Sequence, residues 1–155
     1  MSYHYYWEDL EPGLELDLGG YYLSREEIIQ FSEQYDPLPF HLGEDQAANT
    51  AIGVFCASGI QTMAIAQRLI VDALLSKTAL VAGMGIDKAL FHHPTTADQT
   101  LKITIKITKR DKPIATLNRG RVYYQVKVYS EHNTLLFSMT AKLLILCKSA
   151  ICLPA

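Results

Sequence analysis

The sequence predicts an α+β fold in which a curved antiparallel sheet wraps around one long central helix. The stretch from Ala57 to Leu75 is apolar at most positions, with the spacing of a helix that is buried on many sides. Three later segments, 101–107, 122–128 and 135–145, alternate apolar and polar residues with the period of strands. Their short connections favour antiparallel neighbours, so a sheet that curls around the helix satisfies both patterns.

Length and composition predict a single domain over residues 1–155, without a metal or cofactor. The chain is 49% hydrophobic and carries a net charge of −2, which is not the balance of a nucleic-acid or membrane binder. Cys56, Cys147 and Cys152 are odd in number and lack metal-ligand spacing, which suits a reducing compartment. The first residues lack the pattern of a signal peptide, so we expect a soluble, cytoplasmic protein.

Charge is unevenly distributed along the chain. Residues 1–50 contain eleven acidic side chains and one basic one, Arg25, whereas residues 102–127 contain eight basic ones and the single acid Asp111. The basic segment is explained either by solvated strand faces or by a local anion site, for example for nucleotide phosphates.

The N-terminal third predicts two short strands and a helix. Residues 14–18 alternate as a half-buried strand, Gly19-Gly20 reads as a turn, and 21–23 as a strand that pairs back. Ser24-Arg25-Glu26-Glu27 has the form of a capping box. The helix that follows should run to about Tyr35, because Pro37 disfavours helical geometry at Asp36. It should bury Ile28, Phe31 and Tyr35.

Residues 44–48 could form one helical turn, and 49–53 a loop. The main helix should then start near Gly59, run to about Leu75 and be enclosed nearly all round. Residues 80–91 should form a strand that Gly83 and Gly85 interrupt by a bulge or a close backbone approach.

The candidate functional residues precede this helix. Asp36 and His41 lie five positions apart on a segment stiffened by Pro37 and Pro39. From the residues alone, a turn residue is the favoured explanation of Asp36 and a structural histidine that of His41, while Gly59 could simply allow close packing. The pair His92-His93 lacks a third metal ligand at a sensible spacing.

The segments 35–41 and 57–62, followed by the alternating strands, resemble the MaoC-like dehydratase family of hot-dog proteins, whose best-known members are (R)-specific enoyl-CoA hydratases. Asp36, His41 and Gly59 match the family's motif in identity and spacing, and the resemblance covers roughly residues 25–146. The chain departs from the family at Gln67, where hydratases often have Ser. It departs again at Ser58, where many members have His.

The resemblance implies a hot-dog fold, a homodimer and an acyl thioester substrate carried by coenzyme A or acyl-carrier protein. It implies hydration of trans-2-enoyl-CoA to (R)-3-hydroxyacyl-CoA, or the reverse. Asp36 and His41 would activate water while the Gly59 amide polarises the thioester carbonyl. Phe40, Ser58 and Gln67 would contact substrate. The alternatives are a hot-dog acyl-CoA thioesterase and a non-catalytic acyl-thioester binding protein.

Overall fold

The computed structural model describes residues 3–113 and 115–148. Its helices are α1 (Arg25–Tyr35), α2 (Glu44–Ala48) and α3 (Gly59–Ala73), with short 3-10 turns at Trp7–Asp9, Pro39–His41, Leu75–Lys77 and Ala115–Leu117. Its strands are β1 (Glu15–Leu23), β2 (Leu80–Phe91), β3 (Gln99–Arg110), β4 (Arg119–Tyr129) and β5 (Leu135–Leu146).

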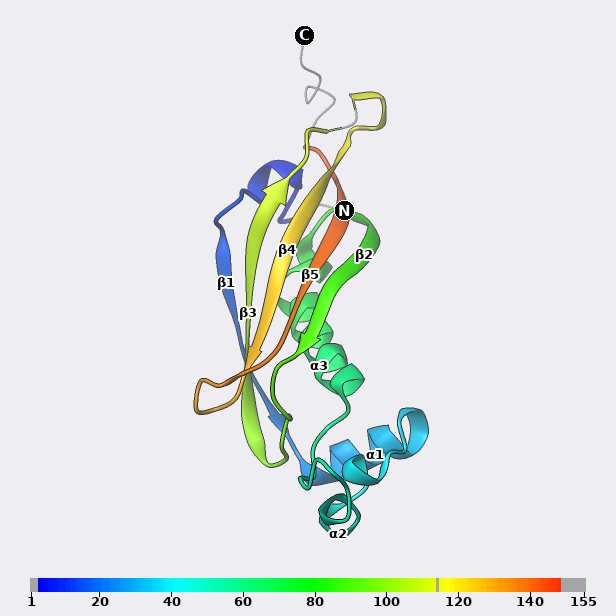
Figure 1. Ribbon diagram of the computed structural model, residues 1–155. Helices are drawn as coiled ribbons and strands as arrows, with labels where there is room; N and C mark the ends of the chain where they lie inside the picture. Colours follow the sequence, from blue (N-terminus) through cyan, green and yellow to red (C-terminus); the bar gives the residue numbers. More distant parts are fainter. Residues whose placement is uncertain (1–2, 114, 149–155) are drawn as a thin grey trace.

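The five strands form one antiparallel sheet in the order β1-β3-β4-β5-β2. Helix α3 runs along one face of this sheet, whereas α1 and α2 gather at one end of the molecule (Figure 1). The α+β architecture of a helix held against an antiparallel sheet, predicted from the sequence, is therefore confirmed.

The alternating segments form strands as predicted. In β3 the side chains of Leu101, Ile103, Ile105 and Ile107 are buried, while those between them are mostly exposed. The inner side chains of β3, β4 and β5 join Ile65 and Ile70 of α3 in one apolar core. This burial is the main force that holds α3 to the sheet.

The N-terminal strand differs from the prediction. β1 is one continuous strand from Glu15 to Leu23, without the expected turn at Gly19-Gly20. Its pairing with β3 shifts register between Asp17 and Gly20, and Gly19 has a φ of +82°. The two glycines thus form a bulge within a strand. In the sequence, a glycine pair at a bulge looks the same as a glycine pair at a turn.

Helix α1 begins with the predicted capping box. Ser24 Oγ accepts a hydrogen bond from the Glu27 amide at 3.2 Å, and Glu27 reaches back to the Ser24 amide. The expectation that Tyr35 is buried is wrong, because its side chain is 66% exposed. Tyr35 packs on Phe31 with ring centroids 5.0 Å apart, while Ile28 and Ser32 carry the buried face.

Helix α3 is less enclosed than its composition predicted. It buries one face, formed by Gln61, Thr62, Ile65, Ala66 and Ile70. Ile60 and Val71, on other sides, are exposed. Within the described chain the sheet packs against only one side of α3, which leaves part of its apolar surface uncovered.

Strand β2 forms an edge of the sheet and pairs only with β5 among the described strands. The predicted irregularity at Gly83 and Gly85 is confirmed, because the pairing with β5 shifts register between them. The large apolar side chains exposed along β2 are Val81, Met84, Ile86, Leu90 and Phe91.

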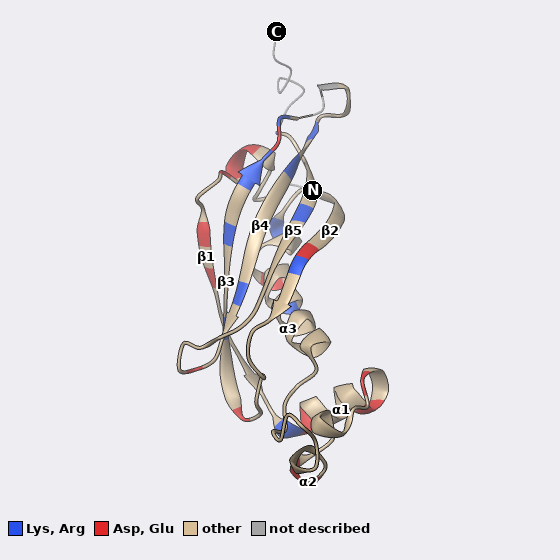
Figure 2. Ribbon diagram, in the orientation of Figure 1, with Lys and Arg blue, Asp and Glu red and all other residues tan. Residues whose placement is uncertain are grey.

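More than half of the basic residues lie on β3, β4 and β5, whereas acidic residues are frequent on β1, α1, α2 and the turn at Trp7–Asp9 (Figure 2). Lys106 pairs with Glu15 at 2.8 Å and Lys109 with Asp111 at 2.8 Å. The Arg110 guanidinium donates to two backbone carbonyls and lies 3.9 Å from the ring centroid of Trp7. Several of these basic side chains are thus engaged in ion pairs or hydrogen bonds with neighbouring residues of the chain.

No helix in the described part of the chain combines the length and the apolarity that crossing a bilayer requires.

Candidate active site

Asp36 and His41 are positioned by the end of α1 and the turn that follows it. α1 stops at Tyr35, and the Asp36 amide closes it by donating to the Ser32 carbonyl at 2.9 Å. Pro39 then begins the 3-10 turn that ends at His41, as its fixed φ favours. The result is a separation of 3.5 Å between His41 Nε2 and Asp36 Oδ2, with the His41 side chain 7% and the Asp36 side chain 31% exposed.

The ring of His41 is oriented by its other nitrogen. His41 Nδ1 lies 2.6 Å from the carbonyl oxygen of Cys56. A carbonyl only accepts hydrogen bonds, so Nδ1 must carry the proton. In the neutral ring, Nε2 therefore keeps its lone pair, and it presents this lone pair on the side of Asp36.

Ser58 connects the carboxylate to the start of α3. Its hydroxyl donates to Asp36 Oδ2 at 2.7 Å and accepts from the Ile60 amide at 3.2 Å, so it acts as the N-cap. The sequence predicted contact of Ser58 with substrate, whereas in the structure its hydroxyl is bonded to Asp36.

Gly59 is the first residue of α3. Amides in the first turn of a helix have no acceptor within it, and the helix dipole adds partial positive charge there. A Cβ at this position would overlap the ring of Phe91, which stacks on Phe137 with centroids 5.5 Å apart. Only glycine fits beneath this ring without displacing it.

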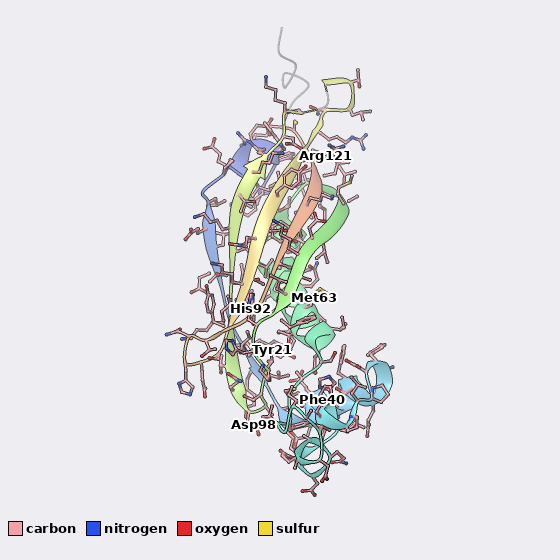
Figure 3. The ribbon with its side chains drawn as sticks, viewed as in Figure 1. Tyr21, Phe40, Met63, His92, Asp98 and Arg121 are labelled. Atoms are coloured by element: carbon pink, nitrogen blue, oxygen red, sulfur yellow. The ribbon has the colours of Figure 1, made fainter. Side chains whose placement is uncertain are left out.

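His41 and Gly59 line the same cavity, which has a volume of about 280 Å³. Phe40 also lines it, together with Ile52, Phe91 and Phe137, so its walls are largely apolar. In Figure 3, Phe40 lies at the end where α1 and α2 gather. The structure thus brings Phe40, His41 and Gly59 around one space. Asp36 and Ser58 do not line it, but they bond to each other, and Asp36 lies next to His41.

Gln67 is separate from this group. It lines a second cavity farther along α3, and the eight residues from Gly59 to Gln67 correspond to about 12 Å along the axis. The structure does not bring Gln67 together with Asp36 and His41.

The sequence did not indicate Thr62 and Thr95, which meet in the first cavity through a hydrogen bond of 3.1 Å between their hydroxyls. His92 and His93 line the same cavity, bonded to Ser138 Oγ and to the Leu135 carbonyl. Within the described residues, no three His, Cys, Asp or Glu side chains gather as a metal site would need. These neighbours depend on how β2 and β5 pair, which a single sequence does not reveal.

The profile of the MaoC-like domain matches residues 11–129, most of the chain, including Asp36, His41 and Gly59. The chain belongs to the MaoC-like domain family. Protein YdeM of Bacillus subtilis is 27% identical over 85 residues, which are 55% of this chain. The match spans 60% of YdeM, less than two thirds of its length.

Solved structures confirm the hot-dog fold. The MaoC-like dehydratase from Rhodospirillum rubrum has a TM-score of 0.84 at 25% identity, over 94% of this chain and 99% of that one. The R-hydratase PhaJ1 from Pseudomonas aeruginosa has a TM-score of 0.68 at 18% identity, over 93% of this chain and 86% of that one. At this lower identity the likeness concerns the fold.

The hydrogen bond to Cys56 fixes a tautomer that NMR can test. We expect neutral His41 to carry its proton on Nδ1, as seen in ring ¹H–¹⁵N correlation spectra. The exposed His132 serves as a reference within the same spectrum. A neutral His41 protonated on Nε2 would contradict this geometry.

Proposed function

We propose that the protein adds water to trans-2-enoyl-CoA to give (R)-3-hydroxyacyl-CoA, or catalyses the reverse dehydration. The observation that carries the proposal is the 3.5 Å approach of His41 Nε2 to the Asp36 carboxylate, with His41 itself lining the same cavity as Gly59. Membership of the MaoC-like domain family and the fold shared with a dehydratase support this class of reaction. An acyl thioester of acyl-carrier protein would suit the same chemistry.

Asp36 and His41 would hold one water molecule between them. The lone pair of His41 Nε2 and the carboxylate of Asp36 both accept hydrogen bonds, so both can accept a proton from that water. As the water oxygen bonds to C3 of the enoyl group, its proton passes to this pair. The pair then returns one proton to C2, so that a single water supplies both the hydroxyl group and the new hydrogen.

The amide of Gly59 would stabilise the charge that develops on the thioester oxygen. It stands at the start of α3, where the donor is free within the helix and the dipole favours negative charge. Ser58 would keep Asp36 oriented through its 2.7 Å hydrogen bond, and Phe40 would form part of the apolar wall beside the acyl group.

The reaction can be tested with purified protein and short and medium enoyl-CoAs, by following the loss of the conjugated enone absorbance. We expect Asp36→Asn and His41→Ala each to lower kcat/KM by about 10²–10⁴-fold, because each removes one side of the water site. Asp45→Asn, on the exposed surface of α2, is the matched control and should leave turnover unchanged.

Product analysis separates the competing functions. A thioesterase releases a free thiol, whereas a hydratase does not. An acyl-thioester binding protein binds without turnover, and binding survives Asp36→Asn. If the parent turns over no enoyl-CoA, or if both variants match an active parent, the hydratase proposal fails.

Gly59 allows a separate test of the backbone donor. Gly59→Pro removes the amide N–H but suits the first position of a helix, so α3 should persist. Gly59→Ala keeps the N–H and adds only the methyl group that meets Phe91. We expect Gly59→Pro to lower kcat by about 10²–10³-fold more than Gly59→Ala. Equal losses would show that the donor is not used.

We further propose that two copies associate through β2. In the described chain, the outer backbone groups of this edge strand have no strand partner. The strand also exposes five large apolar side chains, and their contact with water is unfavourable. A second copy of the same edge would cover both.

Light scattering after size exclusion can test this association. We expect a dimer for the parent and a monomer for Leu90→Arg, because a charge in the covered edge is costly. Leu117→Arg, at an exposed leucine outside β2, is the control and should stay dimeric. A monomeric parent at micromolar concentration would contradict the proposal.

A further inference from the structure

Gln61 is a polar side chain on the buried face of α3, where it is only 5% exposed and has Ile65 and Ala66 as apolar neighbours on the same face. Its nitrogen Nε2 donates a hydrogen bond of 3.1 Å to the backbone carbonyl of Glu27 in α1. Because a carbonyl only accepts hydrogen bonds, this contact fixes which end of the amide faces α1.

The other end of the Gln61 amide is unpaired. Its oxygen Oε1 is buried, and no hydrogen-bond donor of residues 3–113 and 115–148 reaches it. Buried amide oxygens are normally paired, and an unpaired one destabilises a fold. An unbranched apolar side chain of similar length, such as that of methionine, would avoid this cost. Stability therefore does not account for glutamine at this position, whereas its link to α1 does.

Two side-chain hydrogen bonds join α1 and its C-cap to α3 in the described residues. At the end of α1, Asp36 accepts from Ser58, and near its start Glu27 accepts from Gln61. The nine residues from Glu27 to Asp36 correspond to about 14 Å along the helix. Helix α1 lies at the end of the molecule where α3 begins (Figure 1). A helix held at one point can tilt about it, whereas two separated points fix its direction.

Glu27 also attaches the start of α1 to the sheet. The Tyr21 hydroxyl of β1 donates to Glu27 Oε1, and Glu27 Oε2 accepts from the Ser24 amide at 3.4 Å. The hydrogen bond to Glu27 raises the pKa of Tyr21 to about 12, so the phenol is a neutral donor at physiological pH. Glu27 thus contacts β1 with its side chain and α3 with its carbonyl, and one residue of α1 connects the sheet to the central helix.

We propose that Gln61 is a positioning residue for the hydration reaction, because its bond to Glu27 holds α1 in the direction that aims the Asp36 carboxylate at His41. This inference rests on the proposed function. Without the bond, Ser58 alone would join α1 to α3, and a tilt about that contact would turn the carboxylate relative to His41 Nε2, which is 3.5 Å away. Catalysis is sensitive to misplacements of about 1 Å, so the water between the two groups would react more slowly.

Gln61→Met removes the amide donor and keeps a long side chain in the core. We expect kcat for enoyl-CoA hydration to fall about tenfold at an unchanged KM, with a Tm no lower than that of the parent. Gln30→Met, the same change at an exposed position of α1, is the matched control and should keep the parent's kcat. A lower Tm with an unchanged kcat would show that Gln61 serves the fold alone, and would overturn the proposal.

A double-mutant cycle tests whether Gln61 acts through Asp36. In an Asp36→Asn background, Gln61→Met should lower kcat by less than about twofold further, because the group that it positions has already been removed. The full loss in both backgrounds would mean that Gln61 acts by another route, which refutes the positioning role.

The ring nitrogens of His41 provide a readout that needs no turnover. Gln61→Met should shift their signals in ¹H–¹⁵N correlation spectra, because the Asp36 carboxylate faces Nε2, and Gln30→Met should leave them in place. Unchanged His41 signals in Gln61→Met would contradict the proposal. A parent that turns over no enoyl-CoA overturns the hydratase assignment, while these spectra still decide whether Gln61 places Asp36.

Discussion

The hydrogen bond from Ser58 to Asp36 is the contact on which the geometry of the site depends. Asp36 comes from the end of α1, whereas Ser58 begins α3, and the segment between the two helices contains a 3-10 turn, α2 and a loop. The same hydroxyl caps α3, so the position of the carboxylate and the start of the helix are set by one group. A shift of either helix would disturb both.

The surroundings of this contact decide what it can do. His41 Nδ1 is hydrogen-bonded to the backbone carbonyl of Cys56, and this leaves Nε2 directed at the Asp36 carboxylate. The cavity walls are mainly aromatic and aliphatic, and electrostatic interactions gain strength where water is excluded. The polar groups are therefore few, fixed and close to a space that suits an apolar ligand.

Local signals in the sequence were sufficient where a structure depends on neighbours along the chain. The capping box at Ser24, the stop before Pro37 and the alternation in β3 all depend on residues within a few positions. Tyr35 shows the limit, because the face of a helix that is covered depends on its partners. The overlap of Phe91 with Gly59, and the pairing of Ala141 with Tyr124 and Ile86, depend on contacts between elements that lie far apart in the chain. Local patterns in the sequence do not specify these distant contacts.

The tight contact between Gly59 and Phe91 also constrains how the protein can vary. A side chain at position 59 fits only if the ring at 91 moves or is replaced by something smaller. The changes in the free energy of unfolding caused by substitutions at two contacting positions do not add. The effect of a double substitution at 59 and 91 therefore does not follow from the two single substitutions. Positions 59 and 91 are far apart in the chain, but they are constrained together. A substitution tolerated at one position would depend on the residue already present at the other.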